Sequence, residues 1–186
     1  MKEKINIVGF TGSLRRNSYN KAALYAAKEM LPEGVELEIL DLASIPFFNE
    51  DLEAEGIPPD VIEFKNKLLS ADAFLISTPE YNYSIPPVLK NALDWASRGQ
   101  DLPLSGKPLA IMSASLGMFG GARAQYHLRQ VCVALNLLPL NKPEVFIINA
   151  NSKFSVDGKL IDDYYRASIS KLLQALTEVT RAMKQS

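Results

Sequence analysis

The sequence contains very little cysteine and histidine: Cys132 and His127 are the single residues of their types among 186. One cysteine cannot form an internal disulfide, and one cysteine with one histidine cannot complete a structural zinc site. A cysteine-histidine nucleophilic pair is disfavoured, because the two residues lie about 1.4 turns apart on one expected helix and therefore on different faces. We read His127 as a surface or interface residue and Cys132 as a small packed hydrophobe. Any reactive chemistry is therefore expected to come from a cofactor, with no catalytic side chain and no metal.

Excess charge and long apolar runs are also absent. Twenty Lys and Arg residues against 21 Asp and Glu residues give a formal net charge of −1, which provides no broad electrostatic attraction for nucleic acid or an anionic membrane. The longest apolar runs are far shorter than a membrane span, and the first residues lack the apolar stretch of a signal peptide. The composition, 47% hydrophobic and 22% charged, is typical of a globular protein. We expect one cytoplasmic domain over residues 1–186, with no nucleic-acid or membrane partner.

Short β-branched runs alternate with longer segments of helical period, as in a parallel sheet covered by helices on both faces. The expected strands are residues 4–10, 35–40, 73–78, 108–113 and 144–148. The expected helices are residues 18–31, 59–70, 86–98, 121–135 and 161–183. This order predicts an α/β fold, a flavodoxin-like three-layer sandwich with a five-stranded parallel sheet in the order 2-1-3-4-5. Such sheets bind ligands beyond the carboxyl ends of their strands, so the loops after strands 1, 3 and 4 are the candidates.

The loop after the first strand, residues 11–20, combines hydroxyls, amides and two arginines, Arg15 and Arg16, and leads into a helix. Helix-entry N–H groups, the Ser13 hydroxyl and a guanidinium fork suit a phosphate dianion. The loop contains neither a Walker A nor a Gly-x-Gly-x-x-Gly motif, which favours a monophosphate over a nucleoside triphosphate with magnesium. The alternative, about equally supported by this loop alone, makes Ser18 an ordinary helix N-cap and the arginines solvated surface residues.

The loop after the third strand, residues 78–87, contains three prolines, and Tyr81 and Tyr83 flank Asn82. A stiff backbone presents N–H and C=O groups at fixed positions, which suits edge-on recognition of a flat heterocycle walled by tyrosines. Alternatively, this segment is a turn with Ser84 near a helix start, and the tyrosines only pack. The position beside the switch point favours a ligand.

The loop after the fourth strand, residues 115–125, holds three of the ten glycines within five residues, 117–121. Glycine permits a positive φ or a close approach of the backbone to a ligand. A flexible turn between strand and helix would need one glycine rather than three. We therefore expect this loop to approach the same ligand.

Three motifs at these strand ends resemble the NADPH-dependent FMN reductase family, specifically its branch of quinone and chromate reductases. They are Gly12-Ser13-Leu14-Arg15 with Ser18 and Asn20, Pro79-Glu80-Tyr81-Asn82-Tyr83-Ser84 continuing to Leu89-Lys90-Asn91-Ala92-Leu93-Asp94-Trp95, and Gly117 with Gly120-Gly121-Ala122-Arg123. The resemblance spans nearly the whole chain. It implies non-covalent FMN, NADPH or NADH as electron donor, and ping-pong two-electron reduction of small-molecule acceptors: quinones, free flavins, azo compounds or metal oxyanions such as chromate.

The resemblance also implies which residues bind FMN. It assigns the phosphate to Ser13, Arg15, Ser18 and Asn20, and the isoalloxazine ring to Pro79, Glu80, Tyr81, Asn82 and Ser84, with Ser115 and Gly117 approaching from the third loop. Glu80 is expected to use mainly its backbone. Arg16 fits either a second phosphate contact or the 2′-phosphate of NADPH, and the sequence does not choose between them.

The connector of residues 41–59 is long for a compact domain and carries adjacent Phe47 and Phe48. These rings either shape a substrate pocket, cover a subunit contact, or close the core under the connector. The resemblance further implies a homodimer or a dimer of dimers, a homotetramer. Arg123, Tyr126 and Glu144 are the polar candidates for that contact, against the alternative that they are ordinary surface residues.

Two other functions share this fold and cofactor. An electron-carrier flavodoxin usually presents a strongly acidic surface for partner docking, which the net charge of −1 disfavours. A non-catalytic FMN-binding module would keep the three loops but lack turnover.

Overall fold

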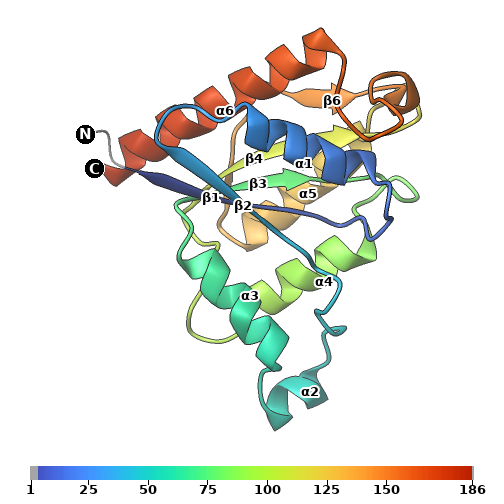
Figure 1. Ribbon diagram of the computed structural model, residues 1–186. Coiled ribbons are helices and arrows are strands. Elements are labelled where there is room, and N and C mark those ends of the chain that lie inside the picture. Colours follow the sequence, from blue (N-terminus) through green and yellow to red (C-terminus); the bar gives the residue numbers. More distant parts are fainter. Residues whose placement is uncertain (1–3, 186) are drawn as a thin grey trace.

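A computed structural model describes residues 4–185 and contains a parallel sheet between two layers of helices (Figure 1). The strands are β1 (Ile5–Thr11), β2 (Val35–Leu40), β3 (Ala73–Ser77), β4 (Pro108–Ala114), β5 (Leu138–Pro139) and β6 (Val145–Ile147). Their order is β2-β1-β3-β4-β5, and β6 also pairs with β4. All pairs are parallel. The predicted flavodoxin-like order 2-1-3-4-5 is confirmed.

The fifth position of the sheet differs from the prediction of one strand at 144–148. β5 pairs with the beginning of β4, at Pro108 and Leu109, whereas β6 pairs with its end, at Met112–Ala114. Between the two short strands the chain leaves the sheet. Pro139 itself lies in β5, where the N–H groups of Leu138 and Leu140 donate at the beginning of β4 on either side of it. Pro143, in the segment between the two strands, has no N–H to donate to a ladder. A strand of two residues is also too short to produce a readable hydrophobic pattern.

Helices cover both faces of the sheet. α1 (Tyr19–Glu29) and α6 (Asp163–Lys184) lie on one face, and α3 (Pro59–Leu69), α4 (Pro87–Ala96) and α5 (Ala122–Ala134) lie on the other (Figure 1). Alternation along β1 supplies both cores: Ile5 and Ile7 face one, and Val8 and Phe10 face the other. The five predicted helices are confirmed, with ends that shift by a few residues.

Two short helical segments were missed by the sequence analysis. α2 (Glu50–Glu55) lies inside the connector 41–59, so that segment is not wholly a loop, and Ala150–Ser152 forms a 3-10 turn. α2 begins at the Asn49 cap, whose side chain accepts from the Asp51 N–H at 2.9 Å. It buries no residue, which explains why no amphipathic pattern marked it in the sequence.

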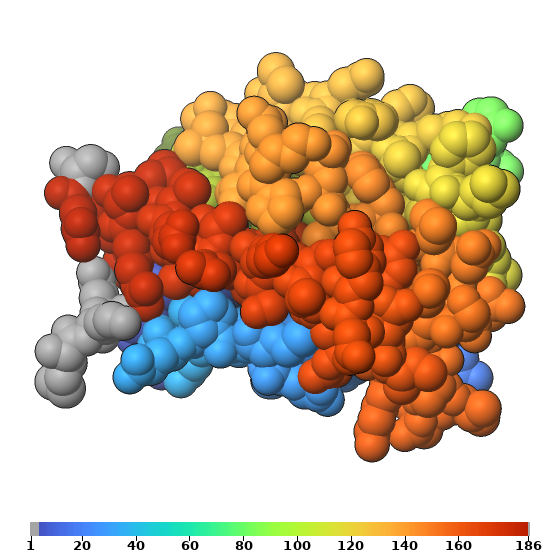
Figure 2. All heavy atoms as spheres, turned by 90° about the horizontal axis from the view of Figure 1, so that it is seen from above, coloured from blue at the N-terminus to red at the C-terminus, as the bar shows by residue number. Residues whose placement is uncertain are grey.

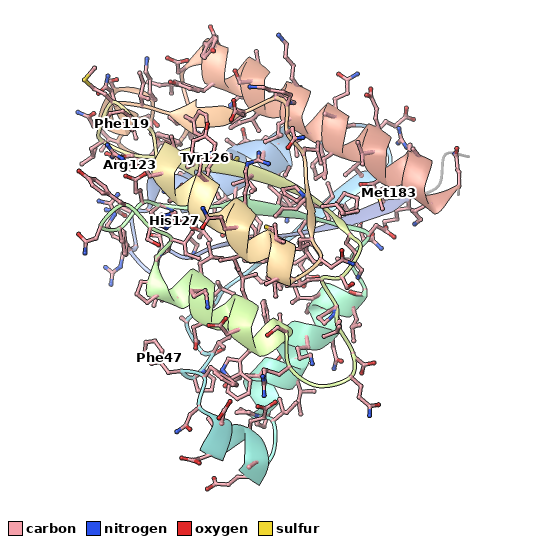
Figure 3. The ribbon with its side chains drawn as sticks, turned by 180° about the vertical axis from the view of Figure 1, so that it is seen from behind. Phe47, Phe119, Arg123, Tyr126, His127 and Met183 are labelled. Atoms are coloured by element: carbon pink, nitrogen blue, oxygen red, sulfur yellow. The ribbon has the colours of Figure 1, made fainter. Side chains whose placement is uncertain are left out.

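The connector is fastened to α4 by hydrogen bonds on either side of Phe47. The Asn91 side chain accepts from the Phe48 N–H at 2.7 Å and donates to the Pro46 carbonyl at 2.9 Å, and Trp95 donates to the same carbonyl at 2.8 Å. The Phe48 ring packs edge-on against Trp95, with centroids 5.0 Å apart. Phe48 therefore closes the core under the connector, whereas Phe47 is 74% exposed and lies toward the same end of the molecule as Phe119 and Arg123 (Figure 3).

Cys132 is fully buried inside α5, which confirms the prediction of a packed hydrophobe. Burial raises the pKa of its thiol to about 12, so the unreactive protonated form persists at neutral pH. Within residues 4–185, no helix has both the length and the apolar character required to cross a membrane.

Candidate functional site

The loops after β1, β3 and β4 meet at the carboxyl ends of the strands. A Cβ on Gly12 would lie 2.3 Å from Cγ of Pro86 and 2.7 Å from Cβ of Leu89, so the loop after β1 packs directly against the beginning of α4. Asn20, in the first turn of α1, connects the other two strands. Its Oδ1 accepts from the Ala114 N–H at 2.9 Å and from the Ser77 hydroxyl at 3.0 Å, and its Nδ2 donates to the Ala114 carbonyl at 2.9 Å. These contacts fix the positions of the three loops relative to one another.

The first loop presents polar groups that the protein itself does not use. Ser13 is only 8% exposed, yet no hydrogen bond within residues 4–185 uses its hydroxyl. Arg15 and Arg16 are exposed and have no carboxylate partner in the same range. The guanidinium of Arg15 lies 5.2 Å from the ring centroid of Tyr19. Unpaired donors and cations at a helix entrance provide a site for an anion.

Ser18 and Asn20 have structural partners at the same helix entrance. The Ser18 hydroxyl accepts from the Lys21 N–H at 3.2 Å and caps α1, as the alternative of an ordinary N-cap proposed. The hydroxyl proton is not used in this bond and stays available for donation to a ligand. The Asn20 amide is committed to β3 and β4. Its main-chain N–H, in the first turn of α1, is the group that remains to face a ligand.

The second loop contains a tight two-residue turn. Tyr81 and Ser84 exchange both backbone hydrogen bonds, at 2.9 and 3.0 Å, and the central residues Asn82 and Tyr83 have φ of +49° and +68°. Two successive positive φ values define a type I′ turn. These two hydrogen bonds define the backbone of the turn, whereas Pro86 and Pro87 lie at the start of α4, as the turn alternative proposed.

Glu80 uses its carboxylate inside the protein. Oε2 accepts from the main-chain N–H groups of Arg123 and Ala124, at 3.0 and 3.2 Å, and Oε1 accepts from Nη1 of Arg123 at 3.2 Å. The carboxylate therefore caps the N-terminus of α5 from a distant loop. The carboxylate is thus engaged within the protein, which is compatible with the expectation that Glu80 would meet a ligand mainly through its main chain.

Two of the three glycines in the third loop are explained by local packing rather than by the approach of a ligand, which the sequence analysis favoured. Gly120 and Gly121 have φ of +57° and +87°, and a Cβ on either would lie within 3 Å of Phe146 or Ser113. Local packing therefore accounts for both. Gly117 differs, because its nearest neighbour would be Oγ of Ser115 at 3.7 Å. Ser115 Oγ also accepts from the Gly117 N–H at 3.1 Å, so these two residues form a compact open turn.

Two residues of α5 contact the second loop in ways that the sequence did not suggest. The Arg123 guanidinium lies 4.1 Å from the ring centroid of Tyr83 and 4.2 Å from that of Phe119. His127 is exposed, as expected of a surface residue, but its Nδ1 lies 3.0 Å from Oγ of Ser84. The spacing of four residues between Arg123 and His127, which places both on one face of a helix, was the available signal.

The other interface candidates lie apart from these contacts. Tyr126 is 54% exposed on α5 (Figure 3), and Glu144 forms an ion pair with Lys142. Of the three interface candidates, Tyr126 is exposed and available for a subunit contact, whereas Arg123 and Glu144 already have partners within their own chain.

A large cleft adjoins the first loop on the side of α1. It has a volume of about 850 Å³ and lies between α1 and the segment that precedes α6. Arg15, Arg16 and Tyr19 line one wall, and Phe154 and Lys159 line the other. Figure 2 shows α6 in red beside the blue N-terminal part of the chain, with orange residues that precede α6 projecting at one end. No residue of the second loop borders this cleft, so it is separate from that loop.

Known proteins are similar to this chain in sequence and in fold. Residues 5–152 match the family described as NADPH-dependent FMN reductase. The chain is 51% identical to an NAD(P)H-dependent FMN reductase of Pseudomonas aeruginosa, over 99% of the chain and 100% of the relative. It is 44% identical to a quinone reductase of Escherichia coli K12, over 99% of the chain and 100% of that relative. Among solved structures, the flavoenzyme NAD(P)H:(acceptor) oxidoreductase FerB of Paracoccus denitrificans matches with a TM-score of 0.87 and 28% identity, over 96% of this chain and 98% of that one.

Proposed function

Because the chain belongs to the NADPH-dependent FMN reductase family, we propose that it is an NAD(P)H-dependent FMN and quinone reductase whose first loop holds the FMN phosphate. The observation that carries this proposal is the set of donors and cations around Ser13 and Arg15 that have no partner within residues 4–185, in a loop that packs against Pro86 of the second loop. Bound FMN supplies the two-electron chemistry, taking a hydride from NAD(P)H and reducing the acceptor.

The residues of the first loop fit a phosphate dianion. Among residues 4–185, the Ser13 hydroxyl has no hydrogen-bond partner and Arg15 has no carboxylate partner, and the Ser18 hydroxyl retains a proton to donate. Asn20 contributes its main-chain N–H. Four charge-assisted hydrogen bonds of about 1.5–3 kcal/mol each give roughly 6–12 kcal/mol before losses. Nanomolar affinity needs about −12 kcal/mol, so we expect the ring contacts to contribute as well.

The residues of the other two loops fit a flat ring. The proposed ring contacts are Pro79, Glu80, Tyr81, Asn82, Ser84, Ser115 and Gly117. The type I′ turn fixes main-chain groups along the ring edge, and the neutralised Glu80 carboxylate brings no net negative charge beside it. These residues bind and orient the ring and exclude water, and none of them is proposed as an acid, base or nucleophile.

Quinones are the acceptors that the relatives' names support. Reduction of free flavins, azo compounds or chromate is a broader proposal, which rests on an open ring face shared by donor and acceptor. We further propose one FMN-binding domain over residues 1–186, a homodimer or dimer of dimers with contacts from Arg123, Tyr126 and Glu144, and a cytoplasmic location where NAD(P)H is supplied.

Turnover of a quinone by the purified protein with FMN and NADPH tests the function. We expect a rate far above that of the same concentration of free FMN, and loss of that excess when FMN is removed by dialysis. A rate equal to that of free FMN would refute the reductase and leave the non-catalytic FMN-binding module as the alternative. A panel of acceptors compared by kcat/KM then identifies which class the site prefers.

A further inference from the structure

Arg123 contacts both loops that we propose to hold the flavin ring. Its guanidinium lies 4.1 Å from the Tyr83 ring in the loop after β3 and 4.2 Å from the Phe119 ring in the loop after β4. Nη1 also donates to Glu80 at 3.2 Å. Figure 3 shows Arg123 beside Phe119 at the N-terminal end of α5. One side chain therefore connects two loops that share no other side-chain contact among the hydrogen bonds and ring contacts found within residues 4–185.

His127 extends this contact by one helical turn. Its Nδ1 lies 3.0 Å from Oγ of Ser84, the last residue of the type I′ turn. Glu80, just before the turn, accepts from the first N–H groups of α5. The turn is thus held to α5 by Glu80, which precedes it, by its last residue Ser84, and at its centre by the stacking of Tyr83 on Arg123.

Such support is physically needed because the turn is strained. Asn82 and Tyr83 both have positive φ, a conformation that costs an L-residue about 1–2 kcal/mol. Residues held in this way persist when their surroundings fix them. Tyr83 and Phe119 are also 65% and 61% exposed in the single chain, so packing against the core of the chain does not hold them. The contacts with Arg123 remain as their anchor.

We propose that Arg123, assisted by His127, is a positioning residue that holds the loops after β3 and β4 together as one rigid unit. This inference rests on the proposed function insofar as that unit binds the flavin ring. Arg123 also balances the Glu80 carboxylate. Its loss leaves a negative charge near the proposed ring site, which disfavours the addition of electrons to bound FMN.

The first experiment compares Arg123→Ala with Arg129→Ala by amide hydrogen exchange without FMN. Arg129 lies on the same helix but donates to the Leu140 carbonyl at 2.7 Å, away from these loops, which makes it a matched control. We expect exchange at residues 81–84 and 117–121 to rise at least tenfold in Arg123→Ala and to stay unchanged in Arg129→Ala. Unchanged exchange in both variants would overturn the proposal, and this result does not depend on whether the protein is a reductase.

The second experiment measures binding and the midpoint potential of bound FMN. Because the phosphate loop is untouched, Arg123→Ala should weaken FMN and riboflavin by the same factor, roughly tenfold, and the midpoint potential should fall. Arg123→Lys keeps the charge but not the planar stacking, so it should restore the potential while affinity recovers only in part. Unchanged affinity and potential in Arg123→Ala, with only a smaller oligomer mass, would show that Arg123 serves the subunit contact instead.

A double-mutant cycle with Phe119→Leu gives a further check. If Phe119 acts through Arg123, the double variant should lose no more riboflavin affinity than Arg123→Ala alone. Losses that multiply would mean that the two side chains act independently and would contradict the positioning role.

Variants of His127 test its assisting role by amide hydrogen exchange. His127→Gln keeps a hydrogen-bonding group near Ser84 and should show the exchange rates of the wild type. His127→Ala should show a smaller rise in exchange than Arg123→Ala.

Discussion

The loop after β1 and the loop after β3 lie side by side but use their charges in opposite ways. In the first, Arg15 and Arg16 have no acidic partner within residues 4–185. In the second, Glu80 is paired with Arg123 and with the N-terminus of α5. A loop that leaves cations unpaired is prepared for a dianion, whereas a loop that neutralises its carboxylate is prepared for a flat ring. We therefore expect the proposed phosphate to be bound by charge and the proposed ring by shape.

The two loops also differ in what holds their backbones. The first is fixed by main-chain packing: Gly12 lies against Pro86 and Leu89, and α1 begins immediately afterwards. The second is fixed by side chains of α5, a helix some forty residues further along the chain. Substitutions in the first loop should therefore act by steric clash or by loss of charge. Substitutions in the second loop should act by changing the conformation of its turn.

Gly12→Ala should have the largest effect. The added Cβ would lie 2.3 Å from Cγ of Pro86, and such overpacking costs typically 1–3 kcal/mol. We expect the free energy of unfolding in urea to fall by about 3 kcal/mol, because the proline ring and the start of α4 leave little room to adjust. Gly117→Ala, where the nearest atom would lie at 3.7 Å, is the matched control and should change it by less than about 0.5 kcal/mol. Equal losses would mean that the close packing of Gly12 against Pro86 and Leu89 does not constrain the first loop.

Arg15→Ala comes next and tests the use of charge. The loss of a charge-assisted contact worth about 1.5–3 kcal/mol should weaken FMN roughly 10-fold to 150-fold, while riboflavin, which lacks the phosphate, should bind as before. Titration of both ligands by flavin fluorescence measures this. An equal loss for the two ligands would remove the phosphate role of Arg15. Together with the uniform loss expected for Arg123→Ala, it separates the phosphate and ring halves of the site.

The sequence predicts the first loop better than the second because the determinants of the first are local. Ser18 caps a helix that begins at the next residue, and the donors around it follow from the start of that helix. The type I′ turn at Asn82 and Tyr83 lacks glycine, so the usual signal of such a turn is missing. Its supports, Arg123 and His127, lie far away in the sequence. The alternation of β-branched runs with helical segments likewise predicts β1 to β4, but it does not reveal that the fifth position of the sheet is divided between β5 and β6.

Asn82→Ala should have a smaller effect that is confined to the ring side. Alanine tolerates the observed φ of +49° less well than asparagine, at a cost of about 1 kcal/mol. We expect a shifted midpoint potential for bound FMN, because the neighbouring main-chain groups move. Asn82→Gly relieves the backbone strain and should keep the wild-type potential. A wild-type potential and full FMN binding in Asn82→Ala would count against a role of this turn beside the ring.

Arg16→Ala should have the smallest effect and decides between the two roles that the sequence leaves open for Arg16. Arg16 lines the cleft of about 850 Å³ beside α1, which is separate from the second loop and large enough for part of a nucleotide. We therefore expect the KM for NADPH to rise up to about fivefold, the scale of one exposed ion pair, while the KM for NADH and the affinity for FMN stay unchanged. A loss of FMN affinity with equal KM values would instead make Arg16 a second phosphate contact. In that case both arginines of the loop would serve one dianion, and the contrast in charge between the two loops would be stronger than the structure alone implies.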